Sequence, residues 1–70
     1  MDPVQRLHNL DRTLTAIASW RKAVADNVPL AEAMDAEWLR LDEERQGIRA
    51  MVSDRELTRY EIERHEVAAV

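Results

Sequence analysis

Two stretches of the sequence carry apolar side chains at alternating spacings of three and four residues, and residues 26–29 (Asp-Asn-Val-Pro) separate them. This spacing places apolar side chains along one side of an α-helix, because a helix turns once every 3.6 residues. The residue before a proline avoids helical geometry and asparagine favours turns, so we expect the chain to reverse direction between the two stretches. The pattern therefore predicts an all-α fold built on an antiparallel helical hairpin.

Start signals in the sequence predict three helices. Asp2 before Pro3 is typical of an N-cap followed by the first helical position, and Pro29 marks the start of a second helix in the same way. Ser53 and Glu56 have the spacing of a capping box, which predicts a short third helix. The expected helices cover residues 3–26, 29–52 and 54–68. We expect them to form a single helical domain over residues 1–70.

The apolar positions of each long helix form one seam at the heptad spacing of a coiled coil. The seam of the first helix contains Leu7, Leu10, Leu14, Ile17, Val24 and Val28, and that of the second contains Ala31, Met34, Trp38, Leu41, Ile48 and Val52. In the antiparallel register set by the turn, Ile17 faces Leu41, and Leu7 approaches Met51 and Val52. The same register brings Arg21 within cation–π distance of the Trp38 ring.

A hairpin of this size covers each seam on one side only. The chain has 70 residues and no cysteine, so its core is small and no disulfide reinforces it. Globular helices usually present a wider apolar stripe than one seam. We therefore expect a homodimer in which two hairpins form a four-helix-bundle-like core. The alternative is a monomer whose third helix folds over its own hairpin as a three-helix bundle.

Two features of the C-terminal half leave alternatives open. Gly47 either ends the second helix early or lies within it, and we expect the helix to continue. The third helix is short and has a thin apolar stripe that includes Leu57 and Tyr60, so it needs a docking surface. That surface belongs either to the chain's own hairpin or to a partner.

No residue pattern indicates catalysis, a cofactor or a metal. His8 and His65 each have a carboxylate about one turn away, at Asp11 and Glu61, but the spacing of a three-ligand metal site is missing. We interpret both histidines as exposed residues with local ion pairs. The sequence contains neither a glycine-rich phosphate loop nor a nucleophile elbow. It predicts a protein that is not an enzyme and has no catalytic residues, cofactor or metal.

The charge pattern disfavours a nucleic-acid partner. The formal net charge is −4, and the arginines of residues 55–64 alternate with glutamates rather than forming a basic patch. No apolar stretch approaches the roughly 20 residues of a membrane span, and the first residues do not resemble a signal peptide. We expect a small acidic cytoplasmic protein without a membrane partner.

Aromatic and apolar residues beside the seams are the candidates for a partner or dimer interface, because interfaces favour tryptophan, tyrosine and arginine. The candidates are Trp20, Arg21, Trp38, Leu39, Leu57 and Tyr60. For each tryptophan the alternative is a place in the core, and for Leu57 and Tyr60 it is docking onto the chain's own hairpin.

These observations favour a non-enzymatic protein-binding module that docks on a larger protein and modulates or inhibits it. Its small size, its negative charge and its surplus apolar surface are typical of small regulators and inhibitors. One alternative is a structural or assembly subunit of a larger complex. Another is a regulator that binds nucleic acid.

Overall fold

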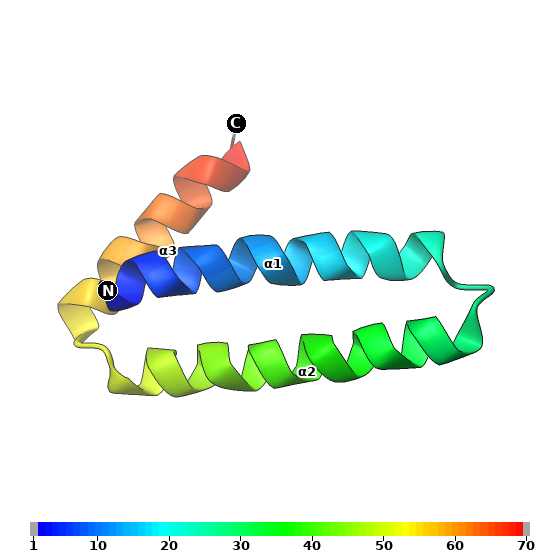
Figure 1. Ribbon diagram of the computed structural model, residues 1–70. Coiled ribbons are helices and arrows are strands. Elements are labelled where there is room, and N and C mark those ends of the chain that lie inside the picture. The colour runs from blue at the N-terminus through cyan, green and yellow to red at the C-terminus, as the bar shows by residue number, and fades with distance from the viewer. Residues whose placement is uncertain (1, 70) are drawn as a thin grey trace.

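The computed structural model describes the backbone of residues 2–69 and the side chains of residues 2–66. Three helices follow one another, α1 (Pro3–Ala23), α2 (Val28–Met51) and α3 (Asp54–Ala69). Helices α1 and α2 lie antiparallel, and α3 starts beside the beginning of α1 and runs obliquely away from it (Figure 1). Helix α1 packs on both α2 and α3. The predicted all-α architecture, a hairpin with a third helix, is confirmed over the described residues.

Side-chain caps start the three helices. Asp2, Asn27 and Ser53 each accept a hydrogen bond from a backbone N–H of the following first turn, at 3.0–3.2 Å. Each cap satisfies an N–H that the helix itself leaves unpaired, which stabilises a helix by about 1 kcal/mol. The predicted caps at Asp2 and Ser53 are therefore confirmed.

The helix ends differ in part from the prediction. Helix α1 ends at Ala23, three residues earlier than expected, because the Asn27 N–H donates to the Val24 carbonyl at 2.9 Å and closes a turn over residues 24–26. Helix α2 continues through Gly47, as expected. It stops at Val52, whose backbone is extended (φ −78°, ψ 154°), so α3 is a separate helix. We call residues 24–27 the closed end of the hairpin and the opposite end the open end.

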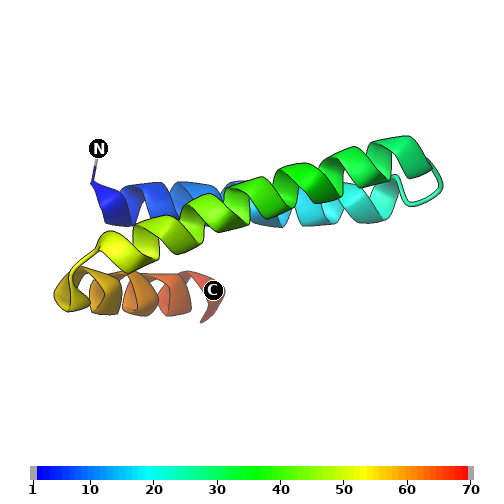
Figure 2. The ribbon, with the colours of Figure 1, turned by 90° about the horizontal axis from the view of Figure 1, so that it is seen from below.

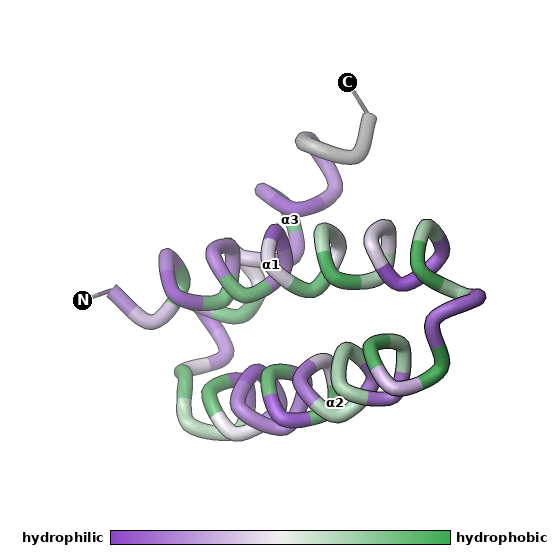
Figure 3. Tube along the Cα trace, turned by 45° about the vertical axis from the view of Figure 1, so that its right-hand side comes forward, coloured by the Kyte–Doolittle hydropathy of each residue, from purple (hydrophilic) through white to green (hydrophobic). Residues whose placement is uncertain are grey.

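Two apolar clusters hold the helices together. The open-end cluster consists of Val4, Leu7 and Tyr60 with Ile48 and Leu57 against them, and the mid-hairpin cluster consists of Leu14, Ile17 and Leu41 with Leu10, Met34 and Trp38. Hydrophobic positions of α1 and α2 face the space between the two helices (Figure 3). The expected proximity of Ile17 and Leu41 is confirmed, because both belong to the mid-hairpin cluster.

Met51 corrects the predicted register at the open end. The expectation that Leu7 approaches Met51 is wrong, because the Met51 residue is 86% exposed and Ile48 packs against the cluster of Leu7 instead. Met51 directly precedes the seam position Val52, which is half-buried, and therefore lies on another side of the helix.

Helix α3 covers only part of the hairpin. The molecule measures 43 × 27 × 16 Å along its principal axes. A view from below shows α3 beside the open end, while the closed end extends beyond it as two helices (Figure 2). The hairpin face on the α3 side is therefore covered near the open end and uncovered toward the closed end.

Candidate functional site

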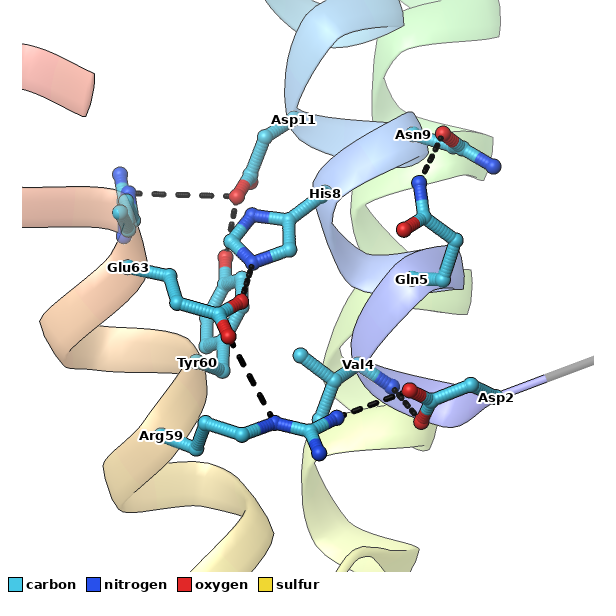
Figure 4. A network of polar contacts seen from close by, with 10 residues as sticks. Asp2, Val4, Gln5, His8, Asn9, Asp11, Arg59, Tyr60 and Glu63 are labelled. Atoms are coloured by element: carbon cyan, nitrogen blue, oxygen red, sulfur yellow. Dashed lines mark hydrogen bonds and ion pairs between the residues drawn. The ribbon is translucent and has the colours of Figure 1, made fainter.

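A polar junction at Asp11 joins the three helices. One carboxylate oxygen of Asp11, Oδ1, accepts a hydrogen bond from Arg45 Nη1 of α2 at 3.0 Å. The other oxygen accepts a hydrogen bond from the Tyr60 hydroxyl of α3 (Figure 4). Arg45 also donates through Nη2 to Asp42 at 2.5 Å. The side chains of Asp11 and Arg45 are each only 17% exposed. A single carboxylate on α1 thus connects α1 to α2 and to α3.

Burial and charge shift the protonation equilibria of this junction. Tyr60 is fully buried, and this burial, together with the hydrogen bond to Asp11 and the negative charge of Asp11, raises the pKa of Tyr60 to about 12. Burial works against the charge on Arg45, but the hydrogen bonds and charges of Asp11 and Asp42 outweigh it, so the pKa of Arg45 is raised. At neutral pH Tyr60 is therefore neutral and Arg45 is charged.

A second set of contacts lies toward the start of α1. His8 Nε2 and Glu63 Oε2 are 2.7 Å apart, and Arg59 Nη2 donates to Asp2 Oδ2 at 2.8 Å (Figure 4). The His8 ring also lies 5.0 Å from the Tyr60 ring, centroid to centroid. These contacts hold the middle of α3 against the first turns of α1.

The interpretation of His8 as an exposed residue paired with Asp11 is wrong. Its side chain is 22% exposed and pairs with Glu63, because Asp11 is already bonded to Tyr60 and Arg45. His65 is exposed, as expected. Within the described part of the chain, no group of three histidine or acidic side chains is placed to hold a metal ion.

A groove continues from the α1–α3 junction toward the closed end. It has a volume of about 670 Å³, and its walls include Leu14, Ala18 and Ser19 of α1 and Trp38 of α2. Most of the lining is apolar, and Arg12 and Arg64 stand at its junction end. Among the described residues, the side chain to which Arg12 donates is the neighbouring Asn9, while Arg64 lies 3.9 Å from Asp11. The groove is thus an apolar surface with two weakly paired guanidinium groups beside it.

The six candidate interface residues fall into different environments. Leu57 is half-buried and packs with the buried Tyr60 in the open-end cluster. These two residues therefore dock onto the chain's own hairpin, which is the alternative that the sequence left open for them. Trp38 is half-buried, packing on the mid-hairpin cluster and lining the groove. Trp20 is 62% exposed and Leu39 is 58% exposed.

Arg21 differs from its predicted role. Its Nε donates to Asp35 Oδ1 of α2 at 3.0 Å, instead of the guanidinium stacking on Trp38. The charged hydrogen bond is the stronger interaction at a half-exposed site, because a cation–π contact there is worth about 0.5–1 kcal/mol. Among the described residues, the guanidinium beside an aromatic ring is that of Arg49, 6.0 Å from the Tyr60 centroid.

Sequence reasoning did not find the Asp11 junction or the His8–Glu63 pair. Helical periodicity identifies neighbours within one helix, whereas these contacts join residues 49 and 55 positions apart. The one sequence feature that pointed to these contacts is the spacing of His8 and Asp11, which are three residues apart and therefore lie on the same side of α1.

Comparison with known proteins gives no match: no protein-family model, no curated protein and no solved structure resembles the chain. None of the helices described here has the length and apolar character that crossing a membrane requires.

Proposed function

We propose that this chain is a small acidic, non-enzymatic protein-binding module that docks on a larger protein and modulates or inhibits it. The observation that carries the proposal is the groove beside α3, which has a volume of about 670 Å³ and a largely apolar lining, and which the chain's own third helix leaves uncovered. Apolar clefts with a few convergent polar groups are the usual form of a recognition site.

The occupant we propose is an amphipathic helix of the partner with acidic residues beside its apolar side. Helix α3 supports this choice, because it is itself an acidic helix on the same side of the hairpin. Its acids pair with basic residues there: Glu61 lies 3.2 Å from Arg49 and Glu63 lies 2.7 Å from His8. A partner helix in the groove would meet Arg12 in the same way.

The shape of the groove also suits a helix. Ala18 and Ser19 are small, which permits close approach of a second backbone, and Trp38 offers a large anchor at the opposite wall. Helix-in-groove recognition uses this combination of a shallow floor and an aromatic wall.

The test is affinity capture from the native cells with two matched variants. Ala18→Glu places a carboxylate in the groove, whereas Ala36→Glu makes the same change on an exposed position of α2 that does not line it. We expect the wild-type chain and Ala36→Glu to capture one protein in stoichiometric amount. We expect Ala18→Glu to bind it at least about tenfold more weakly, because its carboxylate repels an acidic helix and is desolvated by it.

Other outcomes identify the alternative functions. Equal capture by Ala18→Glu and Ala36→Glu would exclude the groove as the binding site. Recovery of several proteins in a fixed ratio, with no change in their activity on titration, would indicate a structural or assembly subunit. Retardation of DNA or RNA by the purified chain at low salt would indicate a nucleic-acid-binding regulator.

A further inference from the structure

A second pocket adjoins the groove at the junction of α1 and α3. Its volume of about 460 Å³ is within the usual range of small-molecule sites. The residues that line it are all polar or charged, and they are Gln5, His8, Asp11, Arg12, Glu63 and Arg64. Most of the pocket surface is nevertheless carbon, because these side chains have apolar stems and rings. We call this pocket the Arg12 pocket.

Side chains of α1 offer hydrogen-bond donors to the pocket. Gln5 and Arg12 are seven residues apart, which is nearly two helical turns, so they lie on one side of α1. Gln5 Nε2 donates to Asn9 Oδ1 at 3.1 Å (Figure 4). Arg12 Nη2 donates to the same oxygen. One acceptor therefore holds the Gln5 amide and the Arg12 guanidinium beside each other, and each of these groups has further N–H donors.

Arg64 offers donors to the pocket from α3. Its Nε lies 3.9 Å from Asp11 Oδ2, which is longer than a hydrogen bond. Asp11 already accepts hydrogen bonds on both oxygens, from Arg45 and from the Tyr60 hydroxyl. The guanidinium of Arg64 is half-exposed and is therefore available to a ligand in the pocket.

The second carboxylate of the lining is engaged as well. Glu63 Oε2 lies 2.7 Å from His8 Nε2, and Glu63 Oε1 lies 3.7 Å from Arg59 Nε. Among the described residues, the side chain to which Arg12 donates is the neutral Asn9. The two carboxylates of the pocket are thus held by other groups, whereas its two guanidinium groups are not neutralised at hydrogen-bond distance.

We propose that the Arg12 pocket binds a phosphate monoester. The phosphate lies between the guanidinium groups of Arg12 and Arg64, and the organic group lies against the carbon surface of the pocket. A phosphate monoester carries a charge of about −1.5 to −2 at pH 7 and has three acceptor oxygens, so it accepts hydrogen bonds from both guanidinium groups and from Gln5. A carboxylate has one charge and two oxygens, which match a single guanidinium.

This site does not rest on the proposed partner helix. Arg12 and Arg64 line both the groove and the Arg12 pocket, but the experiment on the pocket uses the purified chain without a protein partner. The formal net charge of −4 gives a dianion no general attraction to the molecule. Saturable binding of a phosphate monoester would therefore report local contacts.

An NMR titration with phenyl phosphate tests the site, and phenyl sulfate at equal ionic strength is the matched ligand. We expect phenyl phosphate to shift the side-chain N–H signals of Gln5, Arg12 and Arg64 in a saturable way. Phenyl sulfate has nearly the same shape but a single negative charge, so we expect it to bind at least about fivefold more weakly. Equal affinity for the two ligands, or shifts that do not saturate, would overturn the proposal.

Three charge-removing variants locate the binding. Arg12→Gln and Arg64→Gln should each weaken the binding of phenyl phosphate at least about tenfold, because each removes a charge-assisted hydrogen bond. Arg40→Gln removes the same charge from an exposed position of α2 that does not line the pocket, and it should bind like wild type. Circular dichroism establishes that each variant is folded. Equal weakening in all three variants would overturn the proposal.

Three further ligands distinguish the source of the phosphate. Tighter binding of glycerol phosphate than of a phosphoserine peptide with glycine neighbours would indicate a small phosphorylated molecule, and the reverse order would indicate a phosphorylated side chain of another protein. Inorganic phosphate lacks the organic group and should bind more weakly than phenyl phosphate. Equal binding of inorganic phosphate and phenyl phosphate would overturn the assignment to a monoester.

Discussion

Individual side chains at the junction of α3 with α1 have properties that differ from those of the same residues in water. Tyr60 is fully buried, and its hydroxyl donates a hydrogen bond to the Asp11 carboxylate. Asp11 also neutralises part of the charge on Arg45. Removing one such partner from a buried group costs more than forming the bond gains, because the remaining group is left desolvated and unpaired.

We predict that Tyr60 ionises near pH 12 in the folded protein. The pKa of Tyr60 is raised to about 12, whereas an unfolded tyrosine has a pKa of about 10. Between these values the unfolded chain loses a proton that the folded chain keeps, so stability falls as pH rises from about 10 to about 12, by on the order of 2 kcal/mol. Tyrosinate absorbance measures this directly, since the chain has one tyrosine. Asp11→Asn should move the midpoint toward 10, and a wild-type midpoint at 10 would contradict the prediction.

Asp11→Ala should destabilise the protein more than Asp42→Ala does. The first change leaves Tyr60 without a partner and Arg45 with Asp42 alone, at a cost of about 2–4 kcal/mol, whereas the second removes one of the two carboxylates on Arg45 and costs about 1 kcal/mol. Urea unfolding followed by circular dichroism gives both values. Equal costs would show that the Tyr60 bond contributes nothing to stability.

The residue-scale contacts are the part of the molecule that the sequence predicted least. Helical spacing correctly placed His8 and Asp11 on one side of α1, but their partners Tyr60 and Glu63 come from a helix whose crossing angle no spacing reveals. An acid and a histidine on one helix were therefore taken as partners of each other.

At the scale of single helices, local chemistry explains most of what is observed. Each helix starts at a side chain that accepts a hydrogen bond from a backbone N–H of the first turn, and these side chains are Asp2, Asn27 and Ser53. Such caps depend on a few consecutive residues, so they can be recognised in the sequence. The end of α1 was missed because it depends on a turn hydrogen bond between Asn27 and Val24 rather than on a residue type.

The seam of α2 predicts contrasting effects for two neighbouring leucines. Leu41 belongs to the mid-hairpin cluster, so Leu41→Asp buries an unpaired carboxylate and should unfold the hairpin. Leu39 is exposed, and Leu39→Asp should leave the helical circular dichroism nearly unchanged. Equal loss of signal would contradict the assignment of the seam.

Gly47→Ala should stabilise α2 by about 1 kcal/mol. Gly47 lies inside the helix without a positive φ, and a Cβ added there meets no other atom within 4 Å. Glycine therefore contributes only its entropic cost. Urea unfolding of Gly47→Ala beside wild type, followed by circular dichroism, measures the effect. A loss of stability would show that a neighbour contacts this position.

At the scale of the whole molecule, the shape is an extended hairpin with a partial third layer. The sequence left open whether α3 docks on its own hairpin, because a stripe as thin as Leu57 and Tyr60 suits an internal and an external surface equally. The structure shows the internal contact. It leaves the groove uncovered, because α3 is too short and too oblique to cover the hairpin (Figure 2).

Small-angle X-ray scattering of the protein at low concentration tests this shape. The Cα radius of gyration is 13.9 Å, with a longest principal extent of 43 Å. We expect a single chain to give a value slightly above 13.9 Å, since scattering includes side chains and hydration. A markedly larger radius would indicate that α3 leaves the hairpin in solution.

The short connection between α1 and α2 also sets the order in which the molecule assembles. Contacts between α1 and α2 join residues as few as 14 positions apart, such as Arg21 and Asp35, whereas the hydrogen bonds between α1 and α3 join residues 49 to 57 positions apart. Closing the smaller loop loses less chain entropy, so the hairpin forms first and α3 docks last. Since both tryptophans belong to the hairpin and the one tyrosine belongs to α3, the chain carries a separate spectroscopic reporter for each step.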